Sequence, residues 1–151
     1  MKKETLTVLV AARPGPMRNG LLTVIAAILP EAAHIHQTDN GPATLDFLKK
    51  EEPTVVFVDA ALPECQLEEI VQQICSVRPN CKCVAMVTTS HDFFAADEAG
   101  ADVVLLKGFS ATVLRVTLEQ ILPDLSALPV RQIKRPSRQG APASAKTRVV
   151  S

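Results

Sequence analysis

Three polar residues of the chain could act together on a phosphoryl group. Asp59, Thr88 and Lys107 each follow directly on a short run of apolar, valine-containing residues. An aspartate carboxylate can act as a nucleophile towards phosphorus. An ammonium group can stabilise the charge on a transferred phosphoryl group, and a hydroxyl can bind one of its oxygens. The three residues would therefore make a phosphoryl-transfer site if the fold brings them together.

The segments around these residues alternate between strand and helix patterns. The predicted strands are residues 6–10, 33–37, 54–58, 83–87 and 102–106. The predicted helices are residues 17–28, 43–51, 67–75, 93–99 and 111–121, the last of them capped by Ser110. Strict alternation favours an α/β fold, a doubly wound parallel sheet with helices on both faces. Chemistry in such a sheet lies at the carboxyl ends of the strands, which is where the three residues fall.

Charge divides the chain into two parts. Residues 129–151 contain six basic residues and no acid, so residues 1–128 hold all 16 acids against ten bases. The second part is also rich in Pro, Ser and Ala without an apolar period. We predict one folded domain over residues 1–128 and a basic, disordered tail over residues 129–151.

Composition argues against several classes of function. Aromatic residues make up 3% of the chain, with no Trp or Tyr, so a stacking surface for nucleic acid is not expected. No apolar stretch approaches the ~18 residues of a membrane span, and no secretory signal is evident. The pattern indicates a cytoplasmic protein with reduced thiols. No glycine-rich phosphate loop follows the first strand, which weighs against nucleotide binding.

The strand-end residues and the segments around them resemble the receiver domain of two-component response regulators. The resemblance covers roughly residues 5–122 and rests on Val55-Val56-Phe57-Val58-Asp59 with Pro63, on Val87-Thr88-Thr89, and on Ala99-Gly100-Ala101-Asp102 through Leu105-Leu106-Lys107. It implies a flavodoxin-like (βα)5 fold with strand order 2-1-3-4-5. It also implies that Asp59 is the phosphoacceptor, Thr88 the switch hydroxyl and Lys107 the phosphate-sensing cation.

Two positions depart from the receiver pattern. Receivers carry an acidic pair after the first strand that holds Mg²⁺, and here Ala11 and Ala12 stand there. Magnesium needs carboxylate oxygens in near-octahedral geometry, so a site with one carboxylate left is expected to bind it poorly. Receivers also usually carry an aromatic switch residue three positions before the lysine, and here that position is Val104. Both departures predict a pseudo-receiver whose standard switch is absent or altered, with no cofactor.

The remaining candidate groups have simpler interpretations. Arg13 is a candidate pocket cation that could pair with Asp59, although a loop arginine usually points to solvent. The four cysteines lack the two spaced pairs of a zinc site, so packing is the expected role. The pair His34 and His36 is expected on the polar side of an outer strand rather than at a metal.

The function predicted from the sequence is two-component signal transduction by a stand-alone receiver-like domain that is not an enzyme. Its expected partners are a histidine kinase or phosphotransfer protein and a downstream effector, with a homodimer through residues 93–122 as a further contact. Two alternatives stay open at this point. One is a flavodoxin-like domain that binds a small molecule such as cobalamin or flavin. The other is an adaptor that binds nucleic acid through the tail.

Overall fold

The computed structural model describes residues 6–122, and in that range strands and helices alternate. The elements are β1 (Thr7–Ala11), α1 (Pro16–Ile28), β2 (His34–Thr38), α2 (Gly41–Lys50), β3 (Val55–Asp59), α3 (Leu67–Val77), β4 (Lys82–Val87), α4 (Ser90–Ala99), β5 (Val103–Leu106) and α5 (Ala111–Ile121). The five predicted strands and five predicted helices are all present, each within a few residues of its expected bounds. The predicted tail, residues 129–151, lies outside the described residues.

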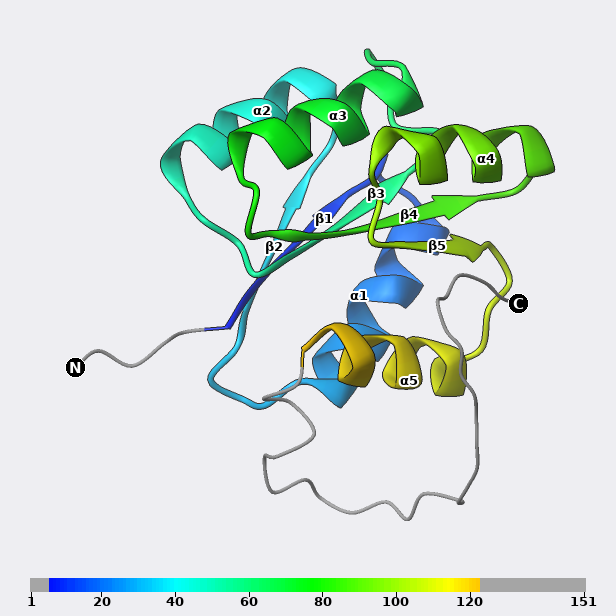
Figure 1. The fold of residues 1–151 in the computed structure, drawn as a ribbon. Helices are drawn as coiled ribbons and strands as arrows, with labels where there is room; N and C mark the ends of the chain where they lie inside the picture. The colour runs from blue at the N-terminus through cyan, green and yellow to red at the C-terminus, as the bar shows by residue number, and fades with distance from the viewer. Residues whose placement is uncertain (1–5, 123–151) are drawn as a thin grey trace.

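The strands form one parallel sheet in the order β2-β1-β3-β4-β5. Helices α2, α3 and α4 cover one face of the sheet, and α1 and α5 cover the other (Figure 1). This is the doubly wound, flavodoxin-like arrangement and the strand order predicted from the sequence. All five strands run the same way, so their carboxyl ends meet at one edge of the sheet.

Two apolar cores lie on the two faces of the sheet. Every residue of β3 is buried, as a central parallel strand between two helical layers requires. Its alternate residues serve different cores: Phe57 packs with α1 and α5, whereas Val56 and Val58 pack on the side of α2, α3 and α4. The strand that carries Asp59 is therefore fixed from both sides.

Side-chain caps mark the start of α2, α4 and α5. The Oγ of Ser110 accepts the N–H of Val113 at 3.1 Å, which confirms the cap predicted for α5. Helix α4 was predicted to begin at Phe93 but begins at Ser90, because Thr89 Oγ1 accepts a backbone N–H three residues on, at 3.0 Å. The prediction gave weight to apolar spacing and overlooked this threonine cap.

The outer strand β2 is mostly exposed. His34 and His36 are both exposed, as the polar placement predicted, with ring centroids 6.5 Å apart. His36 also lies against Phe47 of α2, with ring centroids 5.0 Å apart. Among residues 6–122, none of the helices is both long and apolar enough to cross a membrane.

Candidate functional site

The sheet brings the three strand-end residues to one edge. Asp59 is the last residue of β3 and lies beside Met86 of β4. The next residue of β4, Val87, lies beside Leu106, the last residue of β5. Thr88 and Lys107 follow directly on those two residues. The side-by-side placement predicted from strand order is therefore present.

Asp59 is a buried carboxylate with two recorded contacts, both at the oxygen Oδ1. Its side chain is 3% exposed, and its Oδ1 lies 2.5 Å from Lys107 Nζ. The same oxygen accepts the backbone N–H of Ala61 at 3.0 Å. A buried charge is tolerated only when it is paired and hydrogen-bonded, and both conditions hold here.

The backbone at the end of β5 positions Lys107 beside the Asp59 carboxylate. The N–H of Lys107 donates to the Val87 carbonyl at 2.7 Å, which keeps the residue in line with the end of β4. Gly108 follows with φ 99°, a left-handed conformation that favours glycine. The chain can therefore turn sharply after the lysine while the lysine side chain, 24% exposed, stays on Asp59.

Thr88 stands at the expected strand end, but its side chain is exposed. The next residue, Thr89, uses its hydroxyl to cap α4. A hydroxyl at position 88 lies at the same sheet edge as Asp59 and is open to solvent.

Arg13 is exposed on the loop after β1, and Lys107 is the cation that pairs with Asp59. The buried arginine near this edge is instead Arg18 in the first turns of α1, which is 9% exposed. Its Nη1 donates to the Ala12 carbonyl at 3.0 Å and to Asp39 Oδ1 at 2.6 Å.

No role was predicted for Arg18 from the sequence. A signal was available, because Asp39 follows directly on β2, and β2 lies beside β1 at the same edge of the sheet. A cation in the first turn of the helix after β1 is within reach of an acid at that position. Pairing strand-end acids with bases in the following helices could have found the contact.

Comparison with known proteins decides the family. The model of the response regulator receiver domain matches residues 17–119, more than half of the chain. The chain belongs to the receiver domain family. A response regulatory protein of Vibrio cholerae is 25% identical over 126 residues, which are 83% of this chain and 48% of that protein. The chain thus spans about half the length of the curated relative it matches.

Solved receiver structures share the fold. A response regulator of Chloroflexus aurantiacus has a TM-score of 0.71 at 18% identity, covering 80% of this chain and 99% of the other. The chemotaxis response regulator of Vibrio cholerae has a TM-score of 0.68 at 18% identity, covering 79% of this chain and all (100%) of the other. Family membership implies a part in two-component signalling, and receiver domains are in general signalling modules rather than enzymes.

The metal that receivers normally hold does not fit the residues of this receiver domain. Ala11 and Ala12, at the positions of the acidic pair, are buried with 0% exposure and offer no side-chain oxygen. The Ala12 carbonyl already accepts from Arg18. Within residues 6–122, no group of three His, Cys, Asp or Glu side chains is arranged to hold a metal ion. Among the described residues, the cation that contacts Asp59 is Lys107, at the lysine position of the receiver pattern.

The position of the aromatic switch is occupied by a fixed aliphatic residue. Val104 is 1% exposed and belongs to the core between the sheet and α2, α3 and α4. A valine there has no ring to move between an exposed and a buried position. The receiver domain therefore lacks at this position the side chain that would report on Asp59.

Two of the four cysteines, Cys81 and Cys83, are buried in the receiver domain. Burial raises the pKa of Cys81 to about 12 and raises the pKa of Cys83 well above its ordinary value. Both thiols are therefore protonated at neutral pH, which is the unreactive form. The packing role predicted for them fits this environment.

Proposed function

We propose that this chain is a pseudo-receiver, a signalling domain that works by protein–protein contact without Mg²⁺-dependent phosphorylation of Asp59. The observation that carries the proposal is the state of Asp59 itself. Its Oδ1 contacts Lys107 and the Ala61 N–H, and the two residues that would complete a metal site are buried alanines. A phosphoryl donor would meet a carboxylate already bound to a cation and no metal to neutralise the transferred oxygens.

The ion pair gives the domain one preferred conformation. Lys107 is the only charged partner of Asp59 among the described residues. Because the Asp59 side chain is 3% exposed, water cannot easily replace this partner, and separating the pair is costly. Arg18 holds the neighbouring strand ends in the same way through Ala12 and Asp39. Lys107 and Arg18 thus both stabilise the carboxyl-terminal edge of the sheet, and a fixed edge is suited to a domain that docks with partners constitutively.

The partners we propose are a histidine kinase or phosphotransfer protein and a downstream effector. The surface proposed for contact, and for homodimerisation, is the 93–122 face. Phe94 on α4 is 63% exposed and Val116 on α5 is 44% exposed, so each of these helices, which lie on opposite faces of the sheet, offers one apolar side chain. Leu105, in contrast, is buried and Arg115 pairs with Glu119 at 3.8 Å. Light scattering of wild type and Phe94→Ser would test the homodimer: an apparent mass that is monomeric for both proteins contradicts it.

The phosphorylation state of Asp59 tests the proposal. The protein is incubated with acetyl phosphate and Mg²⁺ and followed by intact mass, with Asp59→Asn as the control and the Ala11→Asp/Ala12→Asp variant as the comparison. We expect no added phosphoryl group on wild type. Stable, Mg²⁺-dependent modification of wild type that Asp59→Asn abolishes would overturn the proposal. Modification confined to the double-aspartate variant would trace the loss of chemistry to the two alanines.

A further inference from the structure

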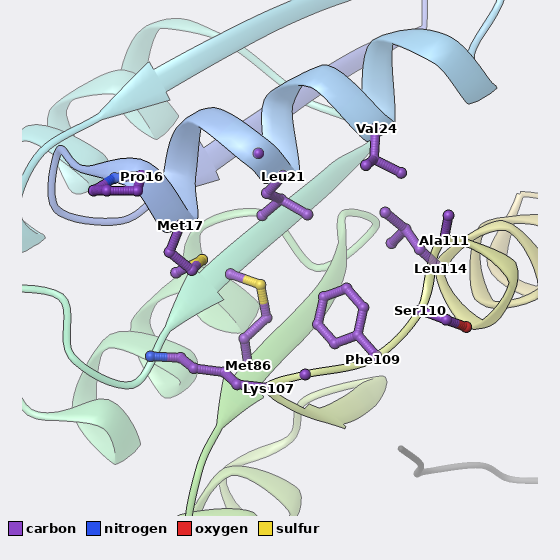
Figure 2. Close-up of a pocket in the computed structure, with 12 residues that line it drawn as sticks. Pro16, Met17, Leu21, Val24, Met86, Lys107, Phe109, Ser110, Ala111 and Leu114 are labelled. Carbon is purple, nitrogen blue, oxygen red and sulfur yellow. The ribbon is translucent and has the colours of Figure 1, made fainter.

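A second feature of the molecule is an apolar pocket between α1 and α5. Its volume is about 240 Å³, and it opens beside the sheet edge that carries Asp59. Its walls come from α1, from the end of β4 and from the chain that leads from β5 into α5 (Figure 2). The residues that shape its interior are Met17, Gly20, Met86, Lys107, Phe109 and Leu114.

One wall of the pocket lacks a side chain because α1 carries Gly20 there, at an exposed position on the rim. Met17, Gly20 and Leu21 lie at helical spacing on the side that lines the pocket. A Cβ built on Gly20 would meet no atom within 4 Å, so the space over this residue is unfilled. Glycine in the interior of a helix is a poor helix former, so its presence is not explained by the stability of α1.

The lining is apolar and adaptable. Figure 2 shows the Met17 and Met86 side chains converging from α1 and β4, with the ring of Phe109 across from them. Methionine is flexible and makes favourable contacts with aromatic rings, so this pair can adjust to the shape of a ligand. Met17 is 41% exposed, which leaves the mouth of the pocket lined by an apolar group.

The charge of Lys107 is directed away from the pocket. The aliphatic stem of Lys107 runs along the pocket floor, while its nitrogen points away from the other lining residues (Figure 2). That nitrogen is bound to Asp59 at 2.5 Å. An anionic ligand would compete with a buried carboxylate for this one ammonium, whereas an uncharged ligand would pack on the stem and leave the pair intact.

We propose that the α1–α5 pocket binds a small uncharged apolar molecule of one or two rings, which packs against the aliphatic stem of Lys107. An apolar cavity of about 150 Å³ is large enough to take up benzene, so the volume here admits a somewhat larger ring system. Lys107 belongs both to the pocket and to the Asp59 pair. Occupancy therefore holds the stem of Lys107 in place from the side opposite its ion pair.

Methionine methyl NMR tests the site with benzyl alcohol as the probe. The chain has three methionines, of which Met17 and Met86 line the pocket and Met1 is the internal reference. We expect the Met17 and Met86 methyl signals to move in a saturable way, with a Kd of about 1 mM, while Met1 stays fixed. No shift of either signal, or equal shifts of all three, would overturn the proposal.

A pair of leucine variants locates the effect in the pocket. Gly20→Leu should fill the space over residue 20 and weaken benzyl alcohol binding at least tenfold. Asn19→Leu places the same side chain one position away, at an exposed residue of the same helix that does not line the pocket, and should bind as wild type does. Far-UV circular dichroism verifies that both variants are folded. Unchanged binding by folded Gly20→Leu would show that the probe binds elsewhere, against the proposal.

A matched pair of ligands tests the chemical class. Benzoate and benzyl alcohol share a ring and differ in charge. We expect benzoate to bind at least tenfold more weakly, because Lys107 is committed to Asp59. Equal or tighter binding of benzoate would overturn the assignment of an uncharged ligand.

Discussion

The Asp59–Lys107 pair predicts an asymmetry between two single substitutions. Lys107→Met keeps the aliphatic stem but removes the ammonium, and so leaves a carboxylate that is 3% exposed without its counter-charge. Removing one partner of a buried pair typically costs about 3–5 kcal/mol. The Lys107 side chain is 24% exposed, so water can reach part of the site. We therefore expect Lys107→Met to lower the free energy of unfolding by about 3 kcal/mol, the lower end of this range.

Asp59→Asn should be milder. The amide oxygen can still accept the Ala61 N–H, and the remaining ammonium on Lys107 can turn towards solvent. We expect a loss of about 1 kcal/mol, and a similar loss for the double variant, since neither then buries an unpaired charge. The coupling free energy between the two positions should be about 3 kcal/mol.

Urea unfolding followed by far-UV circular dichroism measures all four proteins. The chain has no Trp or Tyr, so fluorescence offers no comparable signal. Two single losses below about 0.5 kcal/mol that simply add in the double variant would refute the reasoning. That result would mean that the carboxylate is hydrated or that the lysine does not hold it.

Three further predictions concern other parts of the molecule. Arg18→Met should lower the free energy of unfolding by about 1–3 kcal/mol, because the contacts with Ala12 and Asp39 are lost. The control Arg13→Met should change it by less than about 0.5 kcal/mol, because Arg13 is exposed. Equal effects of the two substitutions in urea unfolding would contradict the role given to Arg18. Gly41→Ala should lower the free energy of unfolding by about 1–3 kcal/mol, since the new Cβ would lie 2.6 Å from the Cβ of Cys65. Gly20→Ala should raise it by up to about 1 kcal/mol, since a Cβ there meets no atom within 4 Å. A stabilised Gly41→Ala variant would show that α2 can shift to make room. The pKa of Cys81 is raised to about 12, so the folded state disfavours the thiolate. Above pH 9 this thiol should therefore lower the free energy of unfolding by up to about 1.4 kcal/mol per pH unit. Urea titrations at several pH values should show a smaller fall in Cys81→Ala than in the wild type.

The fold was predictable from the sequence because each element carried a local signal. The apolar run before Asp59 has the composition of a strand buried on both faces, and β3 is buried throughout. Prolines and glycines marked most of the helix ends. The start of α4 was predicted three residues late, because a threonine cap outweighs weak apolar spacing.

The candidate site was predictable only in part. Strand-end position was enough to bring Asp59, Thr88 and Lys107 to one edge, since this follows from a parallel sheet. Which cation pairs with Asp59, and that Arg18 is buried beneath Asp39, depends on side-chain directions at the edge. The α1–α5 pocket also escaped prediction, because it lies between two helices that are far apart in the sequence.

A Mg²⁺ titration of the backbone amides around Asp59 tests the central claim most directly. Amide signals of residues 59–61 and of Lys107 are followed by NMR as millimolar Mg²⁺ is added, first alone and then with beryllofluoride, with Asp59→Asn as the reference. We predict no saturable change at these signals, because Lys107 holds the carboxylate and two buried alanines replace the acidic pair. Saturable shifts that require Asp59 and grow with beryllofluoride would contradict it and identify a working phosphorylation switch.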